Sequence, residues 1–439
     1  MMTDEKSPVQ EPSPSPLNHT MIEDNTAHNS PTSQESGHRE ENPNEYRPGG
    51  FHPVYIGDVF KDKYKVLNKI GYGRHSTVWL VRVLSPRSSD EPEFRALKIL
   101  RSNYNNDGTS LMFEKDILTH LRDGNREHFG YPYVCHLLDD FEHHGPNGTH
   151  VCLVFELMGE TLRSLGVWWP PHDRVPTLVM HRCIIQLLLA LDFAHDHKVI
   201  HADIKAENIF VKFKDYSMIE SGYLTEVPIP QQNRSEERYT VIPSAPLHLF
   251  YFKEAASFFE LDIVLGDWGV SLWDTGNLCG EIQPEALRSP EVLIGAPWDA
   301  KIDFWNLGAI IFEIFQAIRM FNGRVPQNGR YELKEHLNEI VDFFGPFPKE
   351  LLEKGNQEIV QDIFNDDGTI KDAIPINRPG LNSEEFLPSL KQKDRDVFVS
   401  FLEALMRINP AERAQANDLL RHPWIGALPP KPTADKSGT

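Results

Sequence analysis

The chain has 439 residues, of which 40% are hydrophobic and 25% charged, and its formal net charge is −20. A chain of this length can form two or three folding units with buried cores. Its acidic balance argues against a protein that binds nucleic acid through a basic face, so we expect no direct nucleic-acid partner.

The first 50 residues are expected to form a disordered tail. They contain seven prolines and a single aromatic residue, Tyr46, together with nine acidic and three basic residues. Such a segment cannot bury enough apolar surface to offset the entropy lost on ordering. It also lacks a basic stretch followed by an apolar one, so we expect no secretory signal.

Residues 51–158 are predicted to form a small, mainly β lobe with one helix. β-Branched and aromatic residues predict strands at 64–70, 76–83, 94–100, 134–141 and 150–156. The first two strands flank a glycine corner, Gly71-Tyr-Gly73. Helical spacing of leucine and isoleucine predicts a helix over 111–122.

Residues 159–428 are predicted to form a second, mainly α lobe. Apolar periodicity predicts helices at 177–197, 299–318, 331–344, 394–408 and 416–421. The apolar run 304–318 falls short of the roughly 20 residues of a membrane span. We therefore interpret it as a core helix and expect no membrane partner. Frequent Pro, Ser and Glu predict an insertion or long surface loop at about 212–259, and residues 429–439 are expected to be a short polar tail.

The four cysteines, Cys135, Cys152, Cys183 and Cys279, show no paired spacing. This argues against a disulfide framework or a zinc site, and it indicates a reducing compartment, the cytoplasm or the nucleus.

Phosphoryl transfer from ATP needs a main-chain lid over the phosphates, a cation to hold them, ligands for magnesium and a base for the incoming hydroxyl. Gly71 and Gly73 would let the main chain approach phosphate oxygens, although such a pair also fits an ordinary β-turn. Lys98 lies in an apolar strand and needs an anionic partner, for which Glu114 is the candidate. Taken singly, both also fit exposed positions.

The most specific motif is the segment 199–211, in which two apolar ends flank a polar loop. Asp203 would orient and deprotonate a substrate hydroxyl, Lys205 would neutralise charge on the transferred group, and Asn208 would hold magnesium. Asp267 follows an apolar strand in Asp-Trp-Gly and is the expected ligand of a bridging magnesium, although Asp-x-Gly at a strand end is also a common turn.

Three further residues are predicted to be structural. Glu291 and Arg413 would form a buried bidentate ion pair. Asp303 lies on an apolar helix, and the main-chain amides of residues 201–203 would satisfy its carboxylate.

In this order the glycine corner, Lys98, Glu114, Asp203, Asn208 and Asp267 resemble the motifs of a eukaryotic protein kinase over about residues 51–428. Several segments are similar to the SR-protein kinases, which phosphorylate serines in arginine/serine-rich splicing factors: residues 49–58, 76–80, 204–208 and 288–295. The resemblance implies an α+β, bilobal kinase fold and a short-spacer, fungal-type member that uses ATP and Mg²⁺ and acts as a monomer.

The resemblance also implies an adenine site at the lobe junction, with Phe155 as gatekeeper and the main chain of Glu156 and Met158 facing the base. The nucleotide residues it implies are Ile70, Gly71, Tyr72, Gly73, Val78, Ala96, Lys98, Glu114, Phe155, Glu156 and Met158. Ala202 stands where most kinases carry an arginine that docks a phosphorylated loop, so we expect constitutive activity.

The expected substrates are serines in basic, arginine/serine-rich proteins, which would link the chain to control of mRNA splicing. The acidic net charge favours them. However, residues 322–335, where an acidic docking groove is expected, hold only Glu332 and Glu335 as acids beside three basic residues. Three alternatives remain open: a serine/threonine kinase without this specificity, a pseudokinase scaffold and a small-molecule kinase.

Overall fold

The computed structural model describes residues 40–86, 92–103, 113–165, 175–213, 215–234, 238–247, 260–316, 319–325, 329–374, 376, 379–384, 387 and 390–428. Most of the predicted tail, residues 1–39, and the C-terminal tail, residues 429–439, lie outside these described residues.

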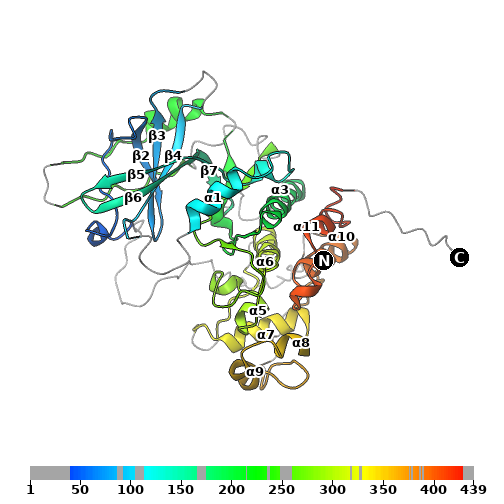
Figure 1. Cartoon of the computed structure of the whole chain (residues 1–439). Coiled ribbons are helices and arrows are strands. Elements are labelled where there is room, and N and C mark those ends of the chain that lie inside the picture. Colours follow the sequence, from blue (N-terminus) through cyan, green and yellow to red (C-terminus); the bar gives the residue numbers. More distant parts are fainter. Residues whose placement is uncertain are drawn as a thin grey trace, which may run out of the picture. The chain divides into compact units, whose positions relative to one another are not determined.

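The N-terminal lobe is built on a six-stranded antiparallel sheet in the order β1-β2-β3-β4-β6-β5 (Figure 1). The strands are β1 Val59–Phe60, β2 Tyr64–Tyr72, β3 Ser76–Val83, β4 Phe94–Leu100, β5 Leu137–Gly145 and β6 Gly148–Glu156. Trp79, Val81, Leu97, Ile99 and Cys152 form the core of one cluster in this lobe. Five predicted strands are therefore present, and the two-residue β1 is too short to have been recognised from its pattern.

Residues 134–136, predicted as the start of a strand, do not belong to the sheet. A 3₁₀ turn covers Tyr131–Tyr133, and Val134 forms an isolated parallel bridge to Leu265 in the other lobe. The Cys135 amide donates to the Leu265 carbonyl at 2.9 Å. The main chain of this segment therefore bonds to the C-terminal lobe, and β5 begins only after it.

Helix α1 (Glu114–Arg122) buries Ile117, Leu118 and Leu121 on one face. Its predicted first residues, 111 and 112, lie outside the described residues. The acidic side chains of its first turn, Glu114 and Asp116, suit the positive end of the helix dipole.

The C-terminal lobe is mainly helical, as predicted. Its helices are α2 Leu162–Leu165, α3 Thr177–Asp196, α5 Pro290–Leu293, α6 Ile302–Gln316, α7 Leu333–Phe344, α8 Lys349–Leu352, α9 Gln357–Ile363, α10 Gln392–Leu405 and α11 Ala416–Leu420. Two small antiparallel sheets are also present, in the orders β10-β9-β7 and β11-β8; their strands are β7 Met158–Thr161, β8 Val199–Ile200, β9 Ile209–Lys212, β10 Ile263–Leu265 and β11 Leu272–Trp273.

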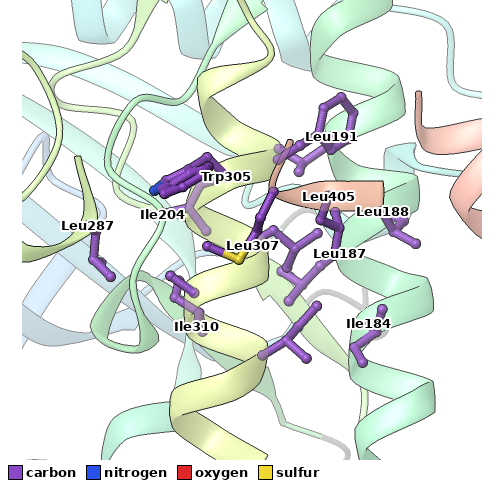
Figure 2. Close-up of a cluster of buried hydrophobic side chains, with 14 of the residues drawn as sticks. Ile184, Leu187, Leu188, Leu191, Ile204, Leu287, Trp305, Leu307, Ile310 and Leu405 are labelled. Atoms are coloured by element: carbon purple, nitrogen blue, oxygen red, sulfur yellow. The ribbon is translucent and has the colours of Figure 1, made fainter. Parts of the chain in front are cut away.

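Helices α3 and α6 form the centre of this lobe (Figure 2). Leu187 and Leu191 of α3 pack in one cluster with Leu307 of α6 and Leu405 of α10, and Trp305 lies on the side of α6 away from α3, near Ile204. Helix α3 has the length and hydropathy of a membrane span, but 61% of its apolar window is buried inside the protein. It is therefore a core helix, as we inferred for α6.

Helix boundaries shift by a few residues where side chains compete for the backbone. The helix predicted from residue 299 begins at Ile302, because Asp299 accepts a hydrogen bond from the Lys301 amide and caps a turn. The helix predicted from Tyr331 begins at Leu333, since Tyr331 bridges to Arg324. The short helices α8 and α9 were not predicted.

The segment 212–259 was predicted as an insertion or long surface loop, and parts of its described residues are packed against the N-terminal lobe. A short π-turn over Ile219–Tyr223 leads into α4 (Leu224–Glu226). Ile219, Tyr223 and Leu247 are buried in one cluster with Leu80 and Phe94. The apolar residues of the segment follow neither helical nor strand spacing, so no periodic pattern indicated their burial.

Residues 40–50 were predicted to belong to the disordered tail, and the structure corrects this boundary. Glu41 is only 5% exposed, and the Asn103 amide donates to the Gly49 carbonyl at 3.1 Å. The segment folds because its acidic side chains meet basic partners in the N-terminal lobe, which composition alone cannot show.

Candidate active site

A cavity of about 660 Å³ lies at the junction of the two lobes. It is bounded by the β2–β3 corner, β4, α1, the link between the lobes and the loop after β8. All eleven predicted nucleotide residues line it: Ile70, Gly71, Tyr72, Gly73, Val78, Ala96, Lys98, Glu114, Phe155, Glu156 and Met158. A cavity of this size suits a small organic ligand.

The glycine corner forms the roof of this cavity. The Gly73 amide donates to the Ser76 carbonyl at 2.8 Å, and the β2–β3 register shifts between Lys69 and Gly71, which twists the corner. A Cβ atom added at Gly71 would have no neighbour within 4 Å. The main chain here therefore faces open space, where a ligand could approach it closely.

Lys98 is the central cation of the site. Its Nζ lies 2.6 Å from Glu114 Oε1 and 3.0 Å from Asp267 Oδ1. Burial lowers the pKa of Lys98, but Asp267 and Glu114 outweigh this effect and hold the pKa above its ordinary value. The attraction of Lys98 in turn lowers the pKa of Asp267. The cation and the Asp267 anion are thus both charged near neutral pH.

The loop after β8 brings three predicted residues together. Asp203 Oδ2 accepts hydrogen bonds from Lys205 Nζ at 2.9 Å and from Asn208 Nδ2 at 2.9 Å. Burial lowers the pKa of Lys205, but the attraction of Asp203 raises it by more, so the pKa lies above its ordinary value. Asp203 is 16% exposed, which leaves its carboxylate accessible to a substrate hydroxyl.

Asp303 supports this loop from beneath, as predicted. Its carboxylate accepts hydrogen bonds from the main-chain amides of His201 at 2.9 Å and Ala202 at 2.8 Å, and it lies 2.8 Å from His195 Nε2. Ala202 adopts a left-handed backbone with φ 65°, which is unfavourable for alanine. Asp303 therefore stabilises a strained turn that presents Asp203.

Asp267 follows β10 in a left-handed conformation with φ 56°, which aspartate tolerates. The next residue, Trp268, is 1% exposed and packs edge-on against the His201 ring at 4.6 Å. Trp268 thus fixes the direction of the turn, and the Asp267 side chain remains 45% exposed in the cavity.

Asn208 and Asp267 together fit the requirements of a magnesium ion. The amide nitrogen of Asn208 is used by Asp203, which leaves the amide oxygen for a cation, and Asp267 contributes a carboxylate. The described residues contain no cluster of three or more His, Cys, Asp and Glu side chains able to hold a metal. Magnesium is commonly held by one or two carboxylates together with substrate phosphates, and the donors here are of that type.

Comparison with known proteins agrees with this geometry. The protein kinase domain model matches residues 64–227 and 256–425. The chain belongs to the protein kinase family. A serine/threonine protein kinase of Aspergillus fumigatus is 33% identical over 86% of this chain and 88% of its own length.

Two further relatives carry names of the SR-protein kinase group. The serine/threonine-protein kinase SRPK of Physarum polycephalum is 27% identical over 89% of this kinase and 92% of the relative. Human SRSF protein kinase 3 is 24% identical over 88% of this kinase and 90% of the relative. The kinase is therefore SRPK-like, and it is a serine/threonine protein kinase.

The fold is likewise shared with solved structures. The crystal structure of a kinase domain covers 85% of this kinase and 98% of its own chain with a TM-score of 0.59 at 20% identity. This likeness shows the bilobal kinase fold and carries no information on substrate.

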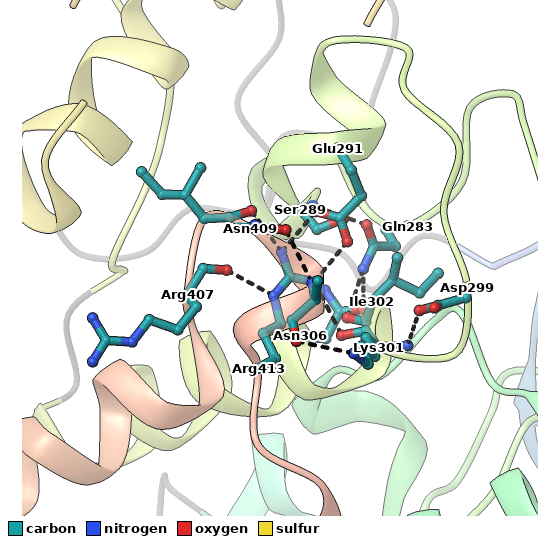
Figure 3. Close-up of polar contacts among 12 residues, drawn as sticks. Gln283, Ser289, Glu291, Asp299, Lys301, Ile302, Asn306, Arg407, Asn409 and Arg413 are labelled. Carbon is teal, nitrogen blue, oxygen red and sulfur yellow. Dashed lines mark hydrogen bonds and ion pairs between the residues drawn. The ribbon is translucent and has the colours of Figure 1, made fainter. Parts of the chain in front are cut away.

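Residues 267–291, from Asp267 to Glu291, are here called the activation segment. The predicted Glu291–Arg413 pair is present and joins the end of this segment to the late helices (Figure 3). Neither residue lines the cavity, so the contribution of the pair is structural. Asn306 of α6 donates to the Leu287 carbonyl at 2.6 Å and ties the same segment to the core.

Several residues of the site were not found from the sequence. Pro246 and Leu247 of the insertion line the cavity of the kinase, as do Thr161, Ser164, Glu207 and Phe210. Glu207 lies within the recognised loop motif and could have been considered. The approach of Leu247 depends on how the insertion folds, and no local pattern indicates it.

Proposed function

We propose that this kinase transfers the γ-phosphate of ATP, with Mg²⁺, to serine in basic, arginine/serine-rich proteins, and that it needs no phosphorylation of its own activation segment. Bound magnesium would offset the phosphate charge. Lys98 would hold the nucleotide phosphates, Asp203 would accept the hydroxyl proton, and Lys205 would balance charge on the transferred group. The close grouping of these side chains supports the assignment.

The main support for the basic-substrate proposal is the carboxylate of Glu313 on α6. Its Oε1 is buried without a hydrogen-bond partner among the described residues, and Arg319 Nε approaches only to 3.9 Å. Burial raises the pKa of Glu313 to about 7, and the nearby Glu207 adds to the increase. A guanidinium group would supply the missing donors.

Glu207 belongs to the loop that carries Asp203, and its own partner Arg163 Nε lies 3.7 Å away. Neither Glu207 nor Glu313 is therefore held by a close ion pair in the described structure. Two carboxylates beside the catalytic loop would favour arginine near the phosphorylated serine. The name of the human relative, SRSF protein kinase 3, also supports the proposal of an arginine/serine-rich substrate.

The predicted groove at 322–335 contributes less to this proposal. The Asn322 and Gly323 amides donate to Glu339 Oε2 at 2.9 and 3.0 Å, and Arg324 binds the Gly329 carbonyl. The Glu339 carboxylate of α7, just outside the predicted groove, is thus used by the main chain of this loop, and the groove itself contains only the two acids Glu332 and Glu335. The attraction of basic substrates is thus assigned to Glu207 and Glu313.

Independence from phosphorylation is supported by Gln283 of the activation segment. Its amide nitrogen donates to Asn306 Oδ1 at 2.8 Å and to the Ile302 carbonyl at 3.1 Å, and its amide oxygen accepts from the Ser289 amide at 2.9 Å. The β8–β11 pairing holds the start of the segment. These neutral contacts fix the segment without the arginine that Ala202 replaces.

The test is transfer of labelled phosphate to an arginine/serine repeat peptide and to a proline-directed peptide, each with the wild type and with Asp203→Ala. We expect strong labelling of the first peptide only, and its loss in the variant. Equal labelling of both peptides would overturn the substrate proposal, and undiminished labelling by Asp203→Ala would overturn the assignment of the base.

Phosphatase treatment of the enzyme before the assay tests the second part of the proposal. We expect unchanged activity, whereas Gln283→Ala should lower it. A large loss of activity after dephosphorylation would show that a phosphate is needed.

The four cysteines are free thiols, three of them buried. This agrees with a reducing compartment, and we propose the cytoplasm or the nucleus as the place of action. Detection of the protein in these fractions of cells would test it.

A further inference from the structure

Lys69 of β2 is a completely buried cation whose ammonium group is bound by two segments outside the sheet. Its Nζ lies 2.5 Å from Glu41 Oε2 and 2.8 Å from Glu40 Oε2, both from the chain before the N-terminal lobe. It also donates to the Ile242 carbonyl of the insertion at 3.0 Å. A buried ammonium group is tolerated only with such partners.

The two outer segments are also bonded to each other. Glu40 Oε1 accepts from the Ser244 amide at 2.6 Å, and Glu40 Oε2 accepts from the Ser244 hydroxyl at 2.9 Å. Burial raises the pKa of Glu40, but the bonds to Lys69 and Ser244 lower it below its usual range. The carboxylate therefore stays charged. We call Glu40, Glu41, Lys69, Ile242 and Ser244 the Lys69 clamp.

The clamp lies directly beside two walls of the nucleotide cavity. On β2, Lys69 precedes Ile70 and the glycine corner, which form the roof. On the insertion, the Ala245 amide donates to the Lys69 carbonyl at 2.9 Å, and the next residues, Pro246 and Leu247, line the cavity. One lysine thus positions both the roof and a side wall.

Leu247 is well placed to shape this wall. It is 3% exposed and belongs to a buried cluster against which Ile70 and Ala96, two of the predicted nucleotide residues, are packed. The Tyr223 hydroxyl donates to the Ala245 carbonyl at 2.6 Å and holds the irregular segment 241–246 that precedes Leu247. The wall is therefore supported from the sheet and from within the insertion.

We propose that Leu247 is a nucleotide-contacting residue of this kinase and that Lys69 is a positioning residue, which sets ATP affinity by holding the insertion wall and the glycine corner together. This inference rests on the proposed function, because it assumes that ATP occupies the cavity. A loosened clamp should weaken nucleotide binding while the catalytic groups Asp203 and Lys205 keep their arrangement.

The test compares Leu247→Ala and Glu41→Gln with the matched control Glu45→Gln in the full-length kinase. Glu45 lies in the same segment and pairs with Arg101 at 2.5 Å, away from Lys69. Binding of a fluorescent MgADP analogue gives Kd, and steady-state assays give kcat and the two KM values. For both test variants we expect Kd and the KM for ATP to rise by about 3- to 10-fold, with kcat and the peptide KM within about 2-fold of wild type.

A second pair, Lys69→Met and Lys69→Arg, tests the charge. Lys69→Arg should recover part of the nucleotide affinity that Lys69→Met loses. If Glu41→Gln does not fold, Glu40→Gln replaces it, because the Glu40 side chain is 17% exposed and the amide can keep a hydrogen bond.

Unchanged Kd and ATP KM in Leu247→Ala and in the folded clamp variant would overturn the inference. It would also be overturned if the Glu45→Gln control lost as much nucleotide affinity and kcat as the test variants. Failure of the wild type to bind the MgADP analogue would instead overturn the proposed function. The two failures are therefore distinguishable.

Discussion

The Arg413 guanidinium faces the Glu291 carboxylate through two parallel hydrogen bonds of 2.6 Å, and both side chains are fully buried. Arg413 also donates to the main-chain carbonyls of Arg407 and Lys301 and lies over the Trp305 ring at 5.3 Å. The polar groups of the pair are thus hydrogen-bonded inside the C-terminal lobe, and the removal of one partner should strongly lower the free energy of unfolding.

Replacement of Arg413 by methionine should lower the free energy of unfolding by about 3–5 kcal/mol, because Glu291 would remain as an uncompensated buried charge. Urea denaturation measures the change. Arg407→Met is the matched control, since that side chain is 52% exposed and its Glu403 contact is 3.8 Å long. A loss of less than about 1 kcal/mol for Arg413→Met, the usual scale of a surface pair, would contradict the prediction.

Lys98→Met should reduce kcat by about 100-fold or more, because the variant loses the cation expected to meet the phosphates and the 2.6 Å contact between Nζ and Glu114 Oε1. Steady-state kinetics with saturating ATP measure the effect. Lys115→Met serves as the control, since Lys115 is 48% exposed and pairs with Asp140 away from the cavity. Comparable activity of the two variants would remove Lys98 from the proposed mechanism.

The affinity for basic peptides should rise as the pH increases from 6 to 8. The pKa of Glu313 is about 7, so its carboxyl group is mostly neutral below this value and becomes an anion above it. A guanidinium group binds the anion better. The KM for an arginine-containing peptide should therefore fall with pH, and Glu313→Gln should abolish most of this change. A peptide in which alanine replaces arginine is the control; the same pH profile for both peptides would contradict the prediction.

The N-terminal lobe should lose stability as the pH falls below about 6.5. The His52 ring lies 4.5 Å from His143 and 5.0 Å from His150. Burial lowers the pKa of His52 to about 3, and it also lowers the pKa values of the other two rings. The unfolded chain then binds protons that the folded lobe does not.

The N-terminal lobe therefore keeps its full stability above the unfolded pKa of about 6.5, where the three histidines are neutral in both states. As the pH falls from there toward about 3, the free energy of unfolding decreases by at most about 1.4 kcal/mol per pH unit for each histidine. Thermal melting between pH 7.5 and 5 measures it. His52→Phe keeps the packing against Phe60 and should flatten the slope. An unchanged slope in that variant would show that other groups dominate.

Much of the kinase could be predicted from local patterns. Alternating apolar residues predict β2 and β3 with the glycine corner between them, and helical spacing predicts α3, because both patterns reflect contacts between near neighbours in the chain. The loop with Asp203 and Asn208 was recognised for the same reason, since its residues lie within a few positions of one another. Glu114 and Asp267 were also predicted, as the partner of Lys98 and as a magnesium ligand, but each of them taken singly also fitted an exposed helix face or a common turn.

The amino-acid sequence by itself thus predicted the two lobes, the side chains that gather around Lys98 and Asp203, and the ion pair between Glu291 and Arg413. Only the tertiary structure decided that Lys69 is buried, that the insertion forms a wall of the cavity, and that Glu313 Oε1 is buried without a hydrogen-bond partner among the described residues. Lys69 and Ile242 lie 173 positions apart, and Glu40 and Ser244 lie 204 apart. A charged residue is normally exposed, and it can be buried only where distant parts of the chain supply its partners, which no local pattern records.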